Sequence, residues 1–126
     1  MTLFAACFWF AHDEPFGFKN GYGAIKRWFP AEWAKMDPTQ RGDMASRFHS
    51  SLHAVVVLCH IYALSSCGIW FDSLAMCPAC EPIFSITVGY FFFDFFIVTH
   101  YRMAFWQVFI VHHVAASTPY LSLIHI

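Results

Sequence analysis

The sequence predicts an all-α fold, a polytopic bundle of transmembrane helices. The first observation is composition: 59% of the 126 residues are hydrophobic and 12% are charged, whereas soluble domains carry about a quarter charged residues. The second is a series of apolar runs that approach the roughly 20 residues a helix needs to cross a bilayer. With a net charge of −1, the chain has no basic face for binding nucleic acid, and no such partner is expected.

Residues 1–12 are predicted to hold a partial first transmembrane span. Leu3–Ala11 is apolar but only about half as long as a crossing requires. A signal peptide is the alternative, but the stretch has no basic region before it and no clear small-residue cleavage site after it. We therefore favour the partial span and expect the chain to be truncated at this end.

Residues 13–47 are predicted to form a cytoplasmic interfacial loop. The segment interleaves Trp28 and Trp33 with basic side chains, a mixture suited to the headgroup region of a membrane. Either a helix lies flat there, or the segment is a solvated connector with a few aromatic anchors. Asp37-Pro38 is a candidate helix start leading into the next span, because Asp caps helices and Pro fits their first turn.

Three further spans are predicted near residues 52–71, 83–101 and 105–120. The first has 20 residues without a formal charge, enough at about 1.5 Å per residue to cross the hydrocarbon core. The third holds only 16 residues up to Tyr120. Residues 121–126 resemble the translation of a transposon-end adaptor used in sequencing libraries. We therefore expect native sequence to stop at Tyr120 and the chain to be truncated at this end too.

Basic residues predict the orientation of these spans. Six of the seven Lys and Arg precede the first full span, and the seventh, Arg102, follows the second. The positive-inside rule then places residues 13–47 and Arg102 in the cytoplasm and the loop 72–81 on the opposite side. Cys77 and Cys80 fall in that loop, where an oxidising compartment would permit a disulfide. A small structural disulfide and two unpaired thiols both remain open.

Asp94 lies near the middle of the second full span. A carboxylate at the bilayer centre costs about 2.5 to 3.5 kcal/mol on insertion scales, so it usually faces a cavity or a partner. Tyr90 shares its helix face. His112 and His113 are about 100° apart on the third span, so one can face a site while the other braces it. Asp94 then acts as a general base, orients an imidazole, or only fixes helix packing.

A stripe of histidines is predicted on the first full span. His53 and His60 are seven residues apart and lie on nearly one face, which His49 extends by a turn. The stripe either lines a functional cavity or holds helices together through hydrogen bonds. Near its cytoplasmic end, Arg47 and Ser51 are candidates for binding a phosphate or acyl-thioester head, although Arg47 has the alternative of snorkelling to the interface.

No metal site is predicted, despite eight histidines. His49-x-x-x-His53 resembles one ligand box of the membrane di-iron oxygenases. An H-x-x-H-H box does not follow, since Phe109 stands where its first histidine would be. Iron and zinc need several convergent ligands, and one box does not supply them.

Two sequence blocks carry a family resemblance. The first is Ser46-Arg47-x-x-Ser50-Ser51-x-His53-Ala54; the second is Gly89-Tyr90-x-x-x-Asp94 followed by Phe109-Ile110-x-His112-His113. Together they resemble the TLC-domain family of polytopic membrane proteins, which includes the ceramide synthases. On this resemblance residues 48–120 form a partial TLC domain.

The resemblance implies a transmembrane bundle, generally in the endoplasmic reticulum, that acts in lipid metabolism, sensing or trafficking. In the ceramide-synthase branch an acyl group passes from acyl-CoA to a sphingoid amine at a centre that the His pair resembles. Asp94, His112 and His113 are therefore candidate catalytic residues, with acyl-CoA as a co-substrate and no bound cofactor. Ala116 stands where ceramide synthases usually carry Thr, so the match is closer to the other, TLC-domain-containing branch.

The leading hypothesis is a TLC-domain membrane protein that binds or acts on acyl lipids and influences membrane lipid composition, with membrane lipids as its partners. One alternative is a ceramide-synthase-like, acyl-CoA-dependent acyltransferase. Another is a non-catalytic lipid-binding or cargo-escort protein, since a shared fold need not mean shared chemistry. The candidate substrate-binding residues are Arg47, Ser51, His53, His60 and Tyr90.

Overall fold

The computed structural model describes residues 2–66 and 81–124, and every regular element in these residues is helical. The all-α prediction is therefore confirmed for this part of the chain. Four short helical segments precede three long helices. In order, the elements are α1 (Thr2–Ala11), the 3₁₀ turn η1 (Pro15–Gly17), α2 (Ala24–Trp28), α3 (Pro30–Lys35), α4 (Pro38–Ser66), α5 (Glu81–Tyr101) and α6 (Trp106–Ile124).

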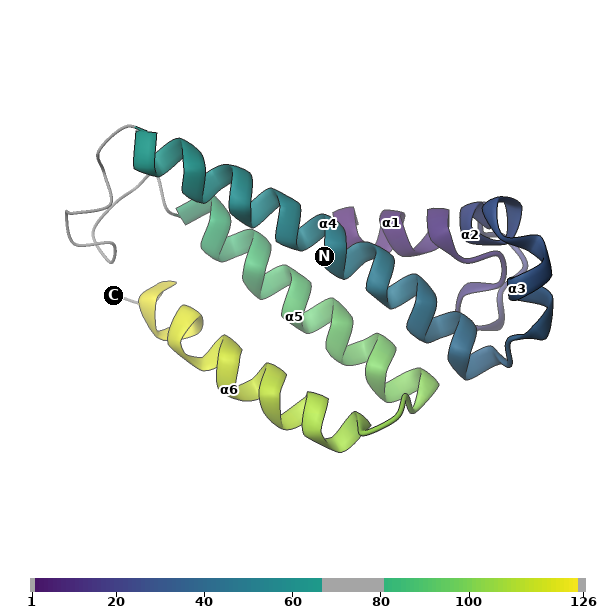
Figure 1. The fold of residues 1–126 in the computed structure, drawn as a ribbon. Helices are drawn as coiled ribbons and strands as arrows, with labels where there is room; N and C mark the ends of the chain where they lie inside the picture. Colours follow the sequence, from purple (N-terminus) through teal and green to yellow (C-terminus); the bar gives the residue numbers. More distant parts are fainter. Residues whose placement is uncertain (1, 67–80, 125–126) are drawn as a thin grey trace.

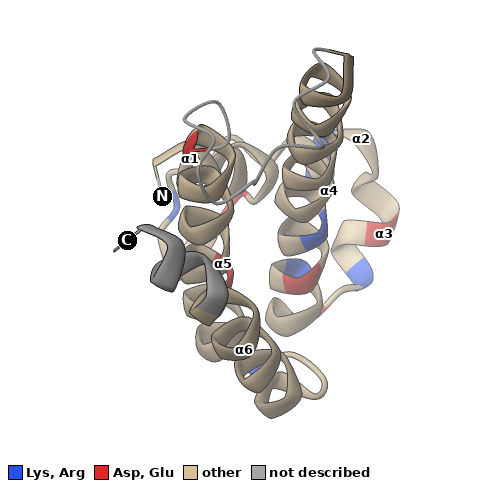
Figure 2. Cartoon of the chain, turned by 90° about the vertical axis from the view of Figure 1, so that its left-hand side faces the viewer, with Lys and Arg blue, Asp and Glu red and all other residues tan. Residues whose placement is uncertain are grey.

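The three long helices lie side by side and run in alternating directions (Figure 1). The middle helix is α5, which contacts both α4 and α6. The short helix α1 packs against α4 and α5, while α2 and α3 lie at the end where α4 begins. Most charged residues of the described chain fall in residues 13–47, which run from the end of α1 through α2 and α3 to the first half of α4 (Figure 2). One end of the molecule is therefore charged, whereas the rest of the long helices is mostly apolar.

A reciprocal cap starts α4. Asp37 Oδ1 accepts the backbone N–H of Gln40 at 2.8 Å, and Gln40 Oε1 accepts the backbone N–H of Asp37 at 3.0 Å. This arrangement satisfies two N–H groups that a helix start leaves unpaired. Pro38 takes the first helical position, where its missing N–H is no loss. The helix therefore begins inside the predicted interfacial loop, and residues 38–47 continue directly into the span.

A short connector joins α5 to α6. Residues 102–105 include Met103, which is buried and whose carbonyl accepts the N–H of Trp106 at 3.0 Å. Arg102 and Phe105 have φ values of 47° and 60°, in the left-handed region, and these turn the chain sharply. A connector this short makes the two helices antiparallel neighbours. It thereby brings the histidines of α6 beside the middle of α5.

The core lies where α1 covers the groove between α4 and α5. Phe4 and Phe8 of α1 are buried, and the Phe8 ring packs 6.2 Å from His49, 6.1 Å from Phe93 and 6.0 Å from Tyr101 between ring centroids. Aromatic rings at such distances and inclinations pack favourably. The short N-terminal helix thus shields the polar side chains of the long helices from solvent or lipid.

Two helices among the described residues, α4 and α5, are long and apolar enough to cross a membrane by length and composition. In the most apolar 18-residue stretch of each helix, only 11% of the residues of α4 and 39% of those of α5 are buried. Large apolar side chains such as Leu58, Phe96 and Val111 instead point outward. Residues 67–71 of the predicted span 52–71, and the predicted pair Cys77 and Cys80, lie outside the described residues.

Candidate functional site

Asp94 is a buried carboxyl group on α5 that contacts both neighbouring long helices. Its exposed fraction is 4%. From α4, the Ser46 hydroxyl donates to Oδ1 at 2.8 Å, and His49 Nε2 lies 3.1 Å from the same oxygen. From α6, His113 Nε2 lies 2.7 Å from Oδ2. Both carboxyl oxygens therefore have close polar neighbours on other helices, as a buried carboxyl group requires.

One ring nitrogen of His113 faces its own helix, and the other faces Asp94. His113 Nδ1 lies 2.6 Å from the backbone carbonyl of Phe109. Because a carbonyl oxygen only accepts, Nδ1 carries a proton. Nε2 lies 2.7 Å from Asp94 Oδ2 but has no hydrogen-bond partner of good geometry among the described residues. The pair is therefore a close polar contact that links α6 to α5.

A second group of polar contacts joins α4 and α5 one to two turns away from Asp94. The Ser50 and Tyr90 hydroxyls are hydrogen-bonded at 2.9 Å, and His53 Nε2 lies 3.3 Å from Thr87 Oγ1. The His53 ring also stacks on the Tyr90 ring, with centroids 4.0 Å apart and planes 6° from parallel. These contacts hold two predicted substrate-binding residues, His53 and Tyr90, beside Asp94.

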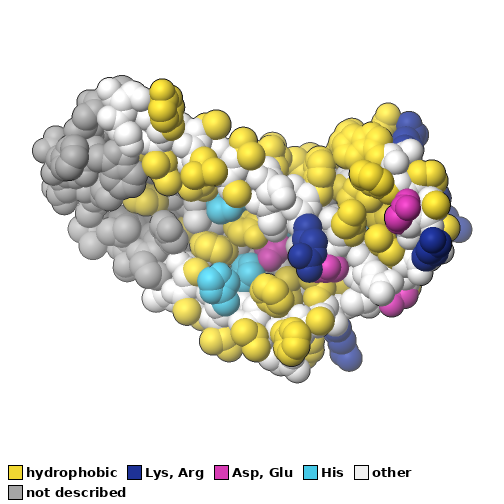
Figure 3. Space-filling view, in the orientation of Figure 1, with side chains coloured by type: hydrophobic (Ala, Val, Ile, Leu, Met, Phe, Trp, Pro, Cys, Tyr) yellow, Lys and Arg dark blue, Asp and Glu magenta, His cyan; other side chains and the backbone are white. Residues whose placement is uncertain are grey.

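A cavity of about 340 Å³ opens beside Asp94. On the face shown in Figure 3, histidine, acidic and basic side chains gather in one place and are bordered by hydrophobic side chains. The cavity therefore presents hydrogen-bonding groups on an otherwise apolar surface. Its lining comprises Asp43, Ser46, Arg47, Ser50, His53, Tyr90, Phe91, Asp94, Val98, Met103, Phe109, His112 and His113. For convenience we call it the Asp94 cavity.

A second cavity, of about 250 Å³, lies between α5 and α6 next to the first. Its lining is almost entirely apolar and consists of Phe91, Phe92, Phe95, Phe96, His113, Val114 and Ser117. Phe91 and His113 belong to both cavities. We call this one the phenylalanine cavity. A polar compartment and an apolar compartment thus meet at the histidine that contacts Asp94.

The remaining predicted site residues take different positions. His112 is exposed and lines the Asp94 cavity, with its ring centroid 5.5 Å from that of His113. Arg47 lies on the rim and pairs with Asp43 at 2.9 Å. Ser51 donates to the carbonyl of Arg47 on its own helix and does not line the cavity. His60 lies further along α4 and lines neither cavity described above.

Two residues that contact Asp94, Ser46 and His49, were not among the predicted site residues. Ser46 begins the first family block, and His49 extends the helix face of His53. Their spacing could have identified both, because residues 46, 49 and 53 share one helix face. His49 is 0% exposed, and its Nδ1 has no hydrogen-bond partner among the described residues.

Within residues 2–66 and 81–124, no group of three His, Cys, Asp or Glu side chains is arranged to hold a metal ion. The nitrogens of His49 and His113 instead lie directly against the oxygens of Asp94.

Comparison with models of protein families, with curated proteins and with solved structures finds no match for this chain. The likeness to the TLC-domain family therefore rests on the two sequence blocks.

Proposed function

We propose that this chain belongs to a multi-pass membrane protein of the endoplasmic reticulum, related to the TLC-domain family, that binds acyl lipids and influences membrane lipid composition. The membrane assignment is supported by the outward-facing apolar side chains of α4 and α5. The core helix of a soluble protein would be mostly buried, which these helices are not. The endoplasmic reticulum follows from the family resemblance.

The single observation that carries the lipid proposal is the junction of the two cavities at Phe91 and His113. An acyl lipid joins a polar head to an apolar chain and needs adjoining sites of the same two kinds. Its head would bind in the Asp94 cavity, where hydroxyl, imidazole and carboxyl groups offer hydrogen bonds. Its chain would lie against the rings of the phenylalanine cavity, where burial of apolar surface contributes about 25 cal/mol per Å².

Acyl transfer is the second candidate, favoured by the placement of His112. His112 is exposed in the cavity, whereas both nitrogens of His113 have close partners and the His53 ring is stacked on Tyr90. His112 would therefore accept a proton from an attacking amine or hydroxyl. The attacking atom would form a bond to the carbonyl carbon of the acyl thioester as the carbon–sulfur bond breaks. The thiolate of CoA would leave and take up that proton from His112. Asp94 and His113 would position the site.

The test uses the protein encoded by the complete transcript, expressed at matched abundance in cells that lack it. Whole-lipid profiles and co-purifying lipid are measured for wild type, Asp94→Asn and His113→Gln. The matched control is His60→Gln, the same chemical change on α4 outside both cavities. We expect wild type and the control to restore the profile and retain lipid, and both cavity variants to lose these properties. If all four behave alike, the Asp94 cavity does not bind lipid.

Purified protein then separates the two candidates. Turnover of acyl-CoA with an amine acceptor that disappears in His112→Gln, while lipid still co-purifies, identifies an acyltransferase. Stoichiometric lipid retention without turnover in wild type identifies a carrier, and this outcome rules out the acyl-transfer candidate.

A further inference from the structure

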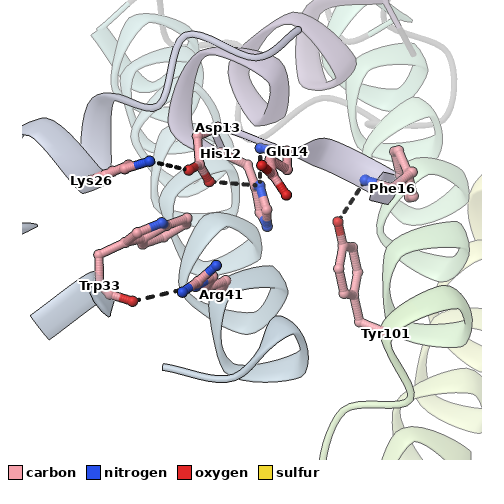
Figure 4. Close-up of polar contacts among 8 residues, drawn as sticks. All are labelled: His12, Asp13, Glu14, Phe16, Lys26, Trp33, Arg41 and Tyr101. Atoms are coloured by element: carbon pink, nitrogen blue, oxygen red, sulfur yellow. Dashed lines mark hydrogen bonds and ion pairs between the residues drawn. The ribbon is translucent and has the colours of Figure 1, made fainter. Parts of the chain in front are cut away.

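A third cavity, of about 360 Å³, lies at the charged end of the molecule and contains neither Asp94 nor His113. It is formed where the chain leaves α1, where α4 begins and where α5 ends. Figure 4 draws five of its lining residues, together with three polar neighbours outside the lining. Its lining consists of His12, Glu14, Phe16, Gly17, Pro38, Thr39, Arg41, His100 and Tyr101. We call it the His12 cavity.

His12 supplies this cavity with a buried donor that lacks an acceptor. The backbone N–H of Glu14 donates to His12 Nδ1 at 2.9 Å, so Nδ1 is unprotonated and the ring proton is on Nε2. His12 is 3% exposed, and Nε2 has no hydrogen-bond partner among the described residues. In Figure 4 this nitrogen points away from Glu14, toward the space between Arg41 and Tyr101. A buried donor without an acceptor is costly, so the geometry indicates an acceptor from outside the chain.

Two further residues direct donors toward the same space. Arg41 donates its Nε–H to the carbonyl of Trp33 at 3.3 Å, which uses one of the five N–H groups of a guanidinium. The Tyr101 hydroxyl oxygen accepts the N–H of Phe16 at 2.7 Å, so its own hydrogen is left to donate. The cavity therefore combines a permanent positive charge with two neutral donors, a set that matches the oxygens of a phosphate group.

The nearby acidic residues do not supply the missing acceptor. Asp13 faces Nδ1 of His12 at 3.6 Å, not Nε2. Its carboxylate accepts a hydrogen bond from Lys26 Nζ at 2.9 Å. Burial raises the pKa of Asp13, but the hydrogen bond and charge of Lys26 outweigh it and hold the pKa below its usual value. Glu14 lines the cavity but is exposed. Lys26 thus pairs with Oδ2 of the ionised Asp13, and Oδ1 faces Nδ1 of His12 without a hydrogen bond of its own among the described residues. Glu14 is the acidic group that lines the cavity.

We propose that the His12 cavity binds the headgroup of a zwitterionic phospholipid of the phosphoethanolamine type. Its phosphate oxygens accept hydrogen bonds from His12 Nε2, Arg41 and Tyr101, and its ammonium group faces Glu14. Tyr101 is the last residue of the apolar helix α5, which places the cavity at the depth of lipid headgroups. The volume, about twelve times the roughly 30 Å³ that one water occupies in the liquid, accommodates such a group.

The inference rests on the membrane placement proposed above but not on the Asp94 cavity. It is tested on the full-length protein in detergent by measuring binding of three probes: dioctanoyl phosphatidylethanolamine, dioctanoyl phosphatidic acid and inorganic phosphate. We expect tightest binding of the phosphatidylethanolamine. Arg41→Gln and His12→Phe should each weaken it by about tenfold or more, since each removes a donor to a charged oxygen. His12→Gln, which keeps an N–H donor and a carbonyl acceptor, should bind nearly as well as wild type.

Three controls keep the outcomes distinct. Lys35→Gln removes a positive charge from the exposed surface of α3, outside both this cavity and the Asp94 cavity, and should leave binding unchanged. Glu14→Gln should reduce the preference for phosphatidylethanolamine over phosphatidic acid. In a His113→Gln background, where lipid retention in the Asp94 cavity is lost, Arg41→Gln should still weaken the remaining phosphatidylethanolamine binding by the same factor. Equal weakening by Arg41→Gln and Lys35→Gln, or binding of inorganic phosphate as tight as that of the lipids, overturns the proposal.

Discussion

Asp94 shows how a single carboxyl group is accommodated inside an apolar bundle. Its oxygens lie against the hydroxyl of Ser46 and the rings of His49 and His113, which belong to two other helices. Without such neighbours, a buried carboxyl group would shift toward its neutral form or draw in water. The same contacts stabilise the fold and form the site, because they join α4 and α6 to the middle helix.

Replacing Ser46 by Ala should lower the free energy of unfolding by about 1.5 to 3 kcal/mol, the range for a hydrogen bond to a charged group. The cause is that a buried carboxyl oxygen loses its hydroxyl donor while the helix propensity barely changes. Unfolding in mixed detergent micelles measures the difference. The control is Ser51→Ala, whose exposed hydroxyl bonds only to the carbonyl of Arg47, and for which we expect a change within about 0.5 kcal/mol. Equal effects of the two substitutions would contradict the assignment.

At the scale of elements, α4 and α5 approach closely where Gly42 faces the Tyr101 ring. A Cβ atom added to Gly42 would fall well inside van der Waals contact with that ring. The absence of a side chain therefore lets the start of α4 lie against the end of α5. The same contact keeps the Tyr101 hydroxyl within reach of the Phe16 backbone, and so shapes the His12 cavity.

Gly42→Ala should destabilise the protein, although Ala is the better helix former by about 1 kcal/mol. Forcing a methyl group against the ring costs about 1 to 3 kcal/mol in displaced packing. Thermal unfolding in detergent checks the sign. In a Tyr101→Ala background the clash partner is gone, so Gly42→Ala should be neutral or stabilising there. A loss of the same size in both backgrounds would show that the two residues are not in contact.

At the scale of the whole molecule, charged and apolar residues separate along the long helices. The charged residues of α3 and the first half of α4 share one end with Arg102, whereas the rest of α4 and α6 carries no formal charge (Figure 2). The positive-inside rule predicts that the charged end faces the cytoplasm.

N-glycosylation mapping in microsomes tests this orientation, because the chain contains one Asn, Asn20, and it is not in an acceptor motif. Tyr22→Ser converts it to Asn-Gly-Ser and should remain unmodified on the cytoplasmic side. An Asn-Gly-Ser tripeptide inserted after Leu74 should be glycosylated. Modification of the first site and not of the second would invert the proposed topology.

The predictable part of the site follows from local sequence patterns. The unusual depth of Asp94 in an apolar run marks it as a residue with a partner, whatever the fold. Helical spacing places His53 and His49 on one face of α4, and the sequence Asp37-Pro38 predicts the helix start. The partners of Asp94 cannot be predicted from local sequence patterns. Ser46 and His113 come within reach of Asp94 only through the packing of α4 and the short turn before α6.

The helical class, the apolar runs and the residues too polar to face lipid follow from the sequence alone, because length, periodicity and hydrophobicity are local properties of a chain. The pairing of His113 with Asp94, the exposure of His112 to the cavity and the position of Ser51 outside it depend on the tertiary structure. The same packing brings together His12 after α1, Arg41 near the start of α4 and Tyr101 at the end of α5. Such contacts depend on the rotation and approach of whole helices, which the summed packing of many side chains sets and no short motif encodes.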